Sequence, residues 1–89
     1  MGNEQQYKDL KLRINAGDAT EFREIFDTVP KTAVGKQLSK NPGTMDNLMD
    51  NPEKVTAKDI YRISQLIKVA PAVILQMILT QYLKNPDNK

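Results

Sequence analysis

The sequence predicts an all-α fold: a compact domain of five helices with an extra helix at its N-terminus. Apolar residues recur three and four positions apart in successive segments, which is the spacing of one helix face. Between these segments stand residues that begin or end helices, chiefly glycine, proline, asparagine and threonine. The length suits one domain, so we expect residues 1–89 to form a single domain with its core over about 18–84 and a flexible tail over 85–89.

The first helix is expected over about residues 4–16, which contain three apolar residues at helical spacing: Tyr7, Leu10 and Ile14. Gly17 suits the C-terminal end of such a helix. The alternative is a short strand over 10–14, where apolar and basic residues alternate. Helix is favoured, because no other segment offers a strand to pair with it.

Capping and proline positions predict the next two helices. Asp18 and Glu21 have the spacing of a capping box, and a single apolar stripe follows over 22–29, made of Phe22, Ile25, Phe26 and Val29. Pro30 suits the first turn of a further helix. That helix is expected to run to about Ser39, with Val34 and Leu38 facing inward and Gly35 on the same side.

Three more helices follow. Asn41-Pro42-Gly43 has the composition of a turn, and a short helix is expected over 44–50, ended by Asn51-Pro52. Thr56 caps a helix whose apolar face is Ile60, Ile63, Leu66 and Ile67, and Pro71 opens a last helix that reaches about Leu83. We expect four residues to be buried together: Leu38, Leu48, Ile63 and Ile67.

Composition narrows the classes of function. The chain has no cysteine and no histidine, which removes disulfides, thiolate chemistry, zinc fingers and the commonest general base at neutral pH. No nucleophile with a base stands out, so we expect no catalytic residue, no metal and no cofactor. The polar N-terminus does not read as a secretory signal, and polar residues interrupt the apolar stretch over 69–83. A cytoplasmic protein without a membrane span is predicted.

The middle of the chain carries the most informative pattern. A short helix, a tight turn and a second short helix are followed by two longer helices, and the residues that set this register are Val34, Gly35, Leu38, Thr44, Met45 and Leu48. Downstream, residues 56–69 and the helix start at 70–74 continue it. In this order the chain resembles the lambda-repressor/Cro-type (XRE-like) helix-turn-helix family over about residues 22–80. The family usually has Leu-Ala where this chain has Val34-Gly35.

The resemblance implies a DNA-binding regulator that sets its second short helix, about 43–50, in the major groove of double-stranded DNA. The residues assigned to DNA binding are Lys31, Lys36 and Lys40 on phosphates, with Gly43, Thr44 and Asn47 on the outer side of the second helix. Asn47 could pair with adenine, and Thr44 could contact a thymine methyl group or a phosphate.

Three departures from the family pattern leave a second function open. Ser39 replaces the turn glycine, with a glycine displaced to 43, and Lys31 lies near a position that is often glutamine. The second helix also carries Asp46 and Asp50 and no cation, and phosphates repel carboxylates. The alternative is a protein-interaction module that keeps the scaffold without binding DNA. A continuous positive band over residues 31–47 would favour DNA, and an acidic face would favour the module.

The last helix predicts a homodimer. Its apolar residues spread around most of the helix circumference, whereas packing on its own domain needs one stripe. The surplus row is Leu75, Leu79 and Leu83, and exposed apolar rows usually mark an interface. A dimer would also suit a protein that recognises paired DNA half-sites. The alternative is that the N-terminal helix folds back and covers this row within one chain.

Overall fold

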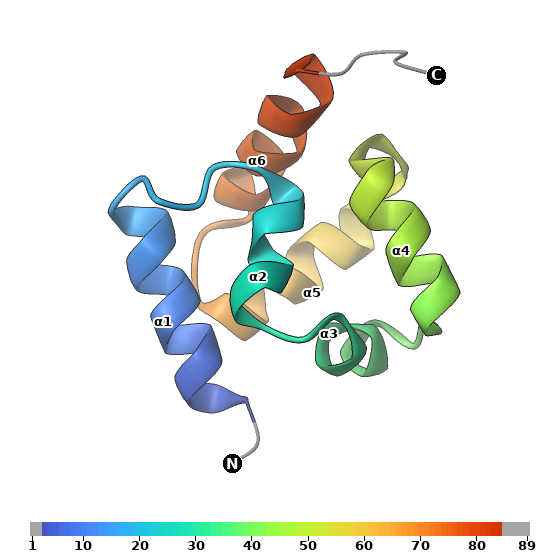
Figure 1. Cartoon of the computed structure of the whole chain (residues 1–89), viewed down its shortest axis with the longest axis horizontal. Helices are drawn as coiled ribbons and strands as arrows, with labels where there is room; N and C mark the ends of the chain where they lie inside the picture. Colours follow the sequence, from blue (N-terminus) through green and yellow to red (C-terminus); the bar gives the residue numbers. More distant parts are fainter. Residues whose placement is uncertain (1–2, 85–89) are drawn as a thin grey trace.

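Short helices joined by turns and loops make up the part of the chain that the computed structural model describes, residues 3–84 (Figure 1). The α-helices are α1 (Glu4–Asn15), α2 (Ile25–Thr28), α3 (Lys31–Leu38), α4 (Pro42–Asp50), α5 (Ala57–Ile67) and α6 (Pro71–Lys84). Two 3-10 helices, η1 (Phe22–Glu24) and η2 (Pro52–Lys54), precede α2 and α5. No strand occurs in this range, so the all-α prediction is confirmed. The tail expected over 85–89 lies outside the described residues.

The first segment is a helix and not the alternative strand. Leu10 is fully buried, whereas Leu12, two positions on, is 68% exposed. In a strand the two side chains would share one face, whereas in a helix they point in nearly opposite directions. Gly17 ends the helix with a φ of +82°, and the next N–H, that of Asp18, donates to the carbonyl oxygen of Arg13 at 2.8 Å. This is the hydrogen-bond pattern of a glycine C-cap.

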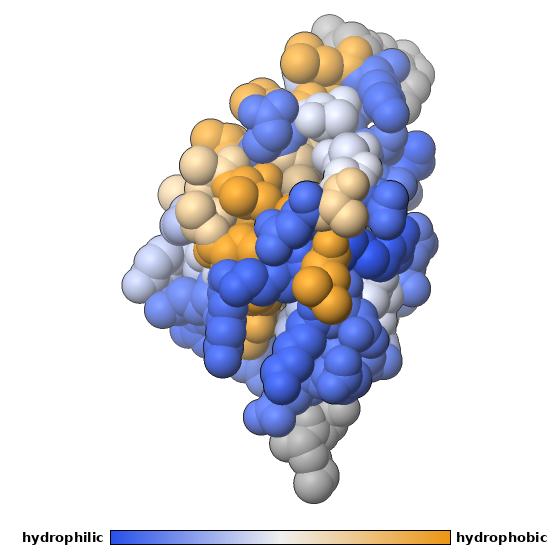
Figure 2. All heavy atoms as spheres, turned by 90° about the vertical axis from the view of Figure 1, so that its left-hand side faces the viewer, coloured by the Kyte–Doolittle hydropathy of each residue, from blue (hydrophilic) through white to orange (hydrophobic). Residues whose placement is uncertain are grey.

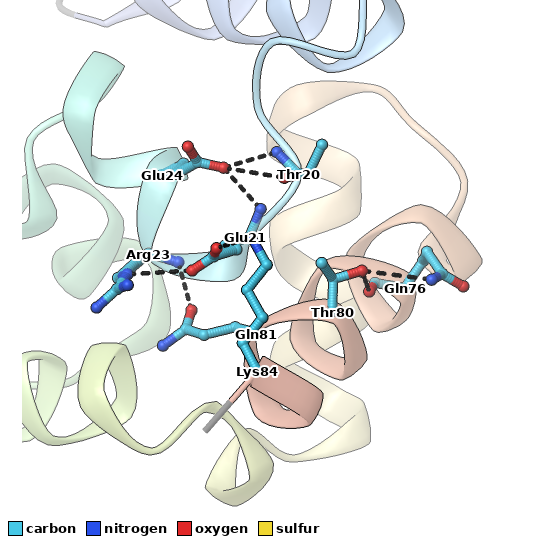
Figure 3. Close-up of polar contacts among 8 residues, drawn as sticks. All are labelled: Thr20, Glu21, Arg23, Glu24, Gln76, Thr80, Gln81 and Lys84. Carbon is cyan, nitrogen blue, oxygen red and sulfur yellow. Dashed lines mark hydrogen bonds and ion pairs between the residues drawn. The ribbon is translucent and has the colours of Figure 1, made fainter. Parts of the chain in front are cut away.

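The predicted capping box at Asp18 and Glu21 is wrong. The N–H of Asp18 is used in ending α1, and the chain then runs to Glu21, which has extended backbone angles. The carboxylate that caps η1 belongs to Glu24: its Oε1 accepts from the N–H groups of Thr20 at 2.7 Å and of Glu21 at 2.8 Å (Figure 3). These two backbone hydrogen bonds hold the pKa of Glu24 below its usual value.

The core draws on all six α-helices. Its members are Leu10, Ala19, Phe22, Ile25, Val29, Val34, Met45, Leu48, Val55, Ile63, Ile67, Ile74, Met77 and Ile78. Of the four residues expected to be buried together, Leu48, Ile63 and Ile67 belong to this cluster, but Leu38 is only partly buried against it. Leu38 is the last residue of α3, beside an open hollow between α3 and the start of α5, and this place leaves one side of it exposed.

The last two helices begin as predicted and pack on each other. Thr56 caps α5, with its Oγ1 accepting from the N–H of Asp59 at 3.2 Å, and Lys68 ends it with a φ of +68°. Pro71 opens α6. Within residues 3–84 no single helix is long and apolar enough to span a bilayer; α5 and α6 reach that length and composition only jointly, across a bend of 115°.

Candidate nucleic-acid interface

The sequence predicts that DNA is bound by the unit formed by α3, a tight turn and α4. Ser39 makes the turn with a φ of +59°, at the position where the resemblance places a glycine. The N–H of the next residue, Lys40, donates to the carbonyl oxygen of Gly35 at 2.8 Å, and the N–H of Ser39 donates to that of Lys36 at 3.3 Å. These bonds form a Schellman motif, which fixes where α3 ends and the turn begins.

The predicted turn at Asn41-Pro42-Gly43 is wrong, because the second helix starts two residues before the expected Thr44. Asn41 is its N-cap, and its Oδ1 accepts from the N–H of Thr44 at 2.8 Å. Pro42 occupies the first helical position, where its missing N–H costs nothing. Gly43 is therefore helical, and the left-handed turn position belongs to Ser39.

Gly35 lets the two helices approach closely. A Cβ atom at this position would lie 2.9 Å from the carbonyl oxygen of Lys40 and 3.0 Å from Cγ of Met45. Both distances are shorter than ordinary van der Waals contact, so an alanine here would press on the turn and on α4. The absence of a side chain at residue 35 thus sets the position of α4 relative to α3.

The outer face of α4 is polar and made of short side chains. Its exposed residues are Pro42, Gly43, Asp46, Asn47 and Asp50, with Thr44 partly exposed beside them. Met45 and Leu48 are buried on the opposite side, and Met49 is partly exposed. The large apolar side chains that are exposed in residues 3–84 lie on α1, α5 and α6, and none is on α3 or α4.

Two of the three lysines assigned to phosphates make ion pairs. Lys31 Nζ contacts Asp46 Oδ1 across the α3–α4 interface, and Lys40 Nζ lies 3.5 Å from Oδ2 of the buried Asp59 on α5. Lys36 is exposed and has no ion pair within the described part of the chain. The outer face of α3 and α4 thus has Lys36 and Asp50 as its unpaired charges, and it is neither a continuous positive band nor a uniformly acidic surface.

The remaining site residues lie near one another on α4. Asn47 is exposed, and its Oδ1 accepts from Nδ2 of Asn51 at 2.9 Å. The first-turn N–H groups of Thr44 and Met45 are bonded to Asn41, whereas the N–H of exposed Gly43 has no partner within residues 3–84. Such a donor at the N-terminus of a helix suits an anionic oxygen.

Sequence reasoning missed three residues that shape this surface. Asn41 caps α4, Asn51 bonds Asn47, and Asp59 draws Lys40 toward α5. An asparagine directly before a proline is a recognisable N-cap signal, and Asn51 stands four positions after Asn47, so local spacing could have found both. The pairing of Lys40 with Asp59 joins the turn between α3 and α4 to α5, and no local pattern indicates it.

Other surfaces of the described residues show fewer features of a binding site. A cleft of about 460 Å³ lies between α1 and α5, lined by Lys8, Lys11, Lys68, Glu4, Tyr7, Leu66 and Ile67. Burial raises the pKa of the Tyr7 phenol there. Among residues 3–84 no three acidic side chains lie close enough together to hold a metal ion. Asp46 and Asp50 lie four positions apart on α4, but Asp46 is paired with Lys31.

The three leucines of the predicted dimer row all face outward. Leu75 is 46% exposed, Leu79 43% and Leu83 68%. Figure 2 shows apolar side chains gathered on the upper part of the face it presents, where α6 lies, above a largely hydrophilic lower part. In Figure 1, α4 lies at the opposite side of the molecule from that face.

Comparisons of this chain with protein-family models, with curated proteins and with solved structures find no match.

Proposed function

We propose that this protein binds double-stranded DNA in a sequence-specific manner, as a regulator of transcription, with α4 in the major groove. The observation that carries the proposal is the outer face of α4, which presents short side chains, most of them polar, and a helical glycine on a unit of two helices joined by a tight turn. Short side chains let a helix backbone approach base edges closely, and the major groove admits one α-helix.

The same face is poorly suited to holding another protein. Protein interfaces are centred on a few large side chains, chiefly tryptophan, tyrosine and arginine, which fill pockets on the partner. Neither α3 nor α4 exposes a large apolar side chain. A polar groove lined by hydrogen-bonding groups is the better complement for Gly43, Thr44 and Asn47.

The ion pair between Lys31 and Asp46 bears directly on this proposal. It neutralises the carboxylate that would otherwise stand beside Asn47, so that phosphate repulsion on this side of α4 is reduced. Lys36 is then the cation free to meet a phosphate, and Lys31 and Lys40 can do so only by leaving their acidic partners. The electrostatic share of binding is therefore small, and hydrogen bonds to bases supply most of the specificity.

Titration of the full chain into a labelled mixed-sequence duplex at low salt tests the proposal. We expect the logarithm of the association constant to fall linearly with the logarithm of the salt concentration, with a slope no steeper than about −3. Each phosphate contact contributes about −0.9 to this slope, and at most three assigned lysines are available. Lys36→Ala should weaken binding uniformly across sequences and reduce the slope by about one. Asn47→Ala should lose about 1–3 kcal/mol of discrimination at one base position.

Lys8→Ala is the matched control, because Lys8 is an exposed lysine on the α1–α5 cleft and not on α3 or α4. It should leave duplex affinity and salt slope unchanged. Asp50→Lys should tighten non-specific binding by replacing the unpaired acid of α4 with a cation. Absence of binding by folded protein at low salt, or loss of binding in Lys8→Ala alone, would overturn the assignment.

A second candidate function is favoured by one observation, the placement of both Asp46 and Asp50 on the exposed side of α4. A protein-interaction module on the same scaffold would present these acids to a basic partner. The two functions give opposite results for Asp50→Lys: the substitution strengthens DNA binding, whereas it weakens the capture of a basic protein surface.

A further inference from the structure

The cleft between α1 and α5 is a feature of this molecule that DNA binding at α4 leaves unexplained. The two helices pack on each other (Figure 1), and a cleft of about 460 Å³ remains between them. Pockets that take small molecules measure about 300–1,000 Å³. The lining comes from one face of α1 and from the C-terminal end of α5, and consists of Glu4, Tyr7, Lys8, Lys11, Leu66, Ile67 and Lys68.

The lining carries a net positive charge. Lys8, Lys11 and Lys68 make no ion pair within residues 3–84, in contrast to the lysines that pair with acids elsewhere in the fold. The lining contains one acid, Glu4, in the first turn of α1. Three cations around one small cleft raise the local concentration of anions, so the charge favours an anionic ligand.

The backbone fixes the position of Lys68 at the cleft. Lys68 has a left-handed φ of +68°, at a helix end where glycine is the usual residue. The N–H groups of Lys68 and Val69 both donate to the carbonyl oxygen of Ser64, at 2.8 Å and 3.0 Å. A glycine would end α5 without strain, but it would bring no charge. The lysine thus adds a cation to the cleft from a backbone that is held in place.

The same cleft also has an uncovered apolar part. Leu66 lies on the predicted apolar face of α5, yet it is partly exposed and does not belong to the core. Tyr7 is partly exposed as well, and its hydroxyl makes no hydrogen bond within residues 3–84. Burial raises the pKa of Tyr7, so the phenol stays protonated at neutral pH and can donate. A ligand that fits this lining has an apolar body as well as a negative charge.

The size of the cleft indicates a small molecule. Its lining on α1 runs from Glu4 to Lys11, which is about 10 Å at a helical rise of about 1.5 Å per residue. An extended peptide of this length has only about three residues, whereas a stable protein interface buries about 800 Å² on each partner. A DNA backbone would meet the lysines but would bring no apolar group to Leu66.

We propose that the cleft between α1 and α5 binds a small organic anion with an apolar body, of the class of medium-chain fatty carboxylates. The carboxylate lies among the ammonium groups of Lys8, Lys11 and Lys68, and the Tyr7 hydroxyl donates to it. The apolar chain covers Leu66. Binding is non-covalent and uses no residue of α3 or α4, so the inference does not depend on DNA binding.

Three ligands separate the charge from the apolar body when each is titrated into the isotope-labelled full chain: octanoate, acetate and 1-octanol. We expect octanoate to shift the backbone amides of Tyr7, Leu66 and Lys68 in a saturable way. It should bind at least about tenfold more tightly than acetate, because its methylene groups leave water. It should also bind at least about twofold more tightly than 1-octanol, which has no charge.

Two results of these titrations would overturn the proposal. One is that 1-octanol binds as tightly as octanoate, since the lysines would then have no role. The other is that octanoate gives no saturable shift at the cleft, or shifts only the amides around the exposed leucines of α6.

Lysine substitutions test the charges separately. Lys68→Gly removes a cation and relieves the left-handed strain, so the variant should fold and should bind octanoate about two- to fivefold more weakly. Lys11→Gln should weaken binding to a similar extent. Lys58→Gln is the matched control, because Lys58 is an exposed lysine at the other end of α5. Equal weakening in Lys58→Gln and Lys68→Gly would mean a non-specific attraction and would sink the assignment.

Leu66→Ser tests the apolar part of the cleft. Because Leu66 lies outside the core, helical circular dichroism should be unchanged, and affinity for octanoate should fall about threefold or more. Leu12→Ser is the matched control, since Leu12 is an exposed leucine of α1 that does not line the cleft. Full affinity in a folded Leu66→Ser variant would contradict the proposed site.

Discussion

Two residues other than glycine, Ser39 and Lys68, adopt left-handed backbone angles in the described chain, and each ends a helix. A side chain with a Cβ atom is strained in this region, whereas glycine is not. Ser39→Gly should therefore raise the free energy of unfolding by up to about 1 kcal/mol, the relief of strain being partly offset by the greater freedom of the unfolded chain. Urea denaturation measures the change.

Gln37→Gly is the control for that substitution, because Gln37 is exposed on the same helix and has ordinary helical angles. It should lower the free energy of unfolding by about 0.5–1 kcal/mol, the usual cost of glycine within a helix. If both substitutions destabilise the protein to the same extent, Ser39 does not make the turn described here.

The carboxylate of Glu24 at the start of η1 makes the unfolding free energy depend on pH. Its pKa in the folded protein is lowered, first by the hydrogen bond from the N–H of Glu21 and then by that from Thr20. A carboxyl group with a lowered folded-state pKa stabilises the fold above its unfolded-state value, about 4.5, and this contribution is lost as the pH falls through the lowered value. The difference in unfolding free energy between wild type and Glu24→Gln should therefore shrink below pH 4.5. A difference independent of pH from 7 to 3 would contradict the assignment.

At the scale of elements, the sequence predicted most helices because their boundaries are local. Thr56, Pro71 and Gly17 act within a turn of the helix they begin or end, and the structure confirms each of them. The 3-10 helices were not predicted, since their short turns depend on what packs around them. The prediction of a capping box was wrong because the N–H of Asp18 takes part in the C-cap of α1. The spacing between Asp18 and Glu21 does not reveal this use.

Gly35 gives the sharpest prediction about the pair α3 and α4. Alanine in place of glycine within a helix normally stabilises it by about 0.5–1 kcal/mol. At residue 35 the added Cβ would lie 2.9 Å from the backbone oxygen of Lys40, so Gly35→Ala should instead destabilise the fold by about 1–3 kcal/mol. Gly43→Ala is the control, because its Cβ would meet only Asn41 Oδ1 at 3.5 Å. Thermal or urea unfolding should thus give the two substitutions opposite signs.

Gln81 joins three elements through two hydrogen bonds, and its polarity within an apolar helix gave no hint of this role. Gln81→Leu would leave the N–H of Arg23 and the carbonyl oxygen of Met49 without partners and should cost about 1–3 kcal/mol. Gln76→Leu, at an exposed position of the same helix, should change the unfolding free energy by less than about 0.5 kcal/mol. Equal effects of the two substitutions on urea denaturation would show that Gln81 does not hold α6.

For the whole molecule, the candidate site was only partly predictable. The turn, the second helix and its polar face follow from the order of residues between 31 and 50. The charge state of that face depends on contacts between helices: Lys31 with Asp46, and Lys40 with Asp59. The first pair depends on the close approach of α3 and α4 at Gly35, and the second depends on how the turn packs against α5. Composition and spacing determine neither.

The outer face of α4 and the leucine row of α6 belong to different helices of a molecule that measures 39 × 29 × 21 Å. In Figure 1 α4 lies on the right-hand side, and Figure 2 shows the opposite side, where apolar side chains gather in the upper part. Leu79→Glu should therefore leave the affinity for a DNA duplex unchanged.

The most direct test of the central claim is to record backbone amide NMR shifts of the full chain while a mixed-sequence DNA duplex is added at low salt. We expect the largest changes at Lys36 on α3 and at Gly43, Thr44 and Asn47 on α4, with the amides of α6 and α1 unchanged. Changes confined to the lysine-lined cleft between α1 and α5, or no change with duplex in excess, would contradict the assignment of DNA binding to α4.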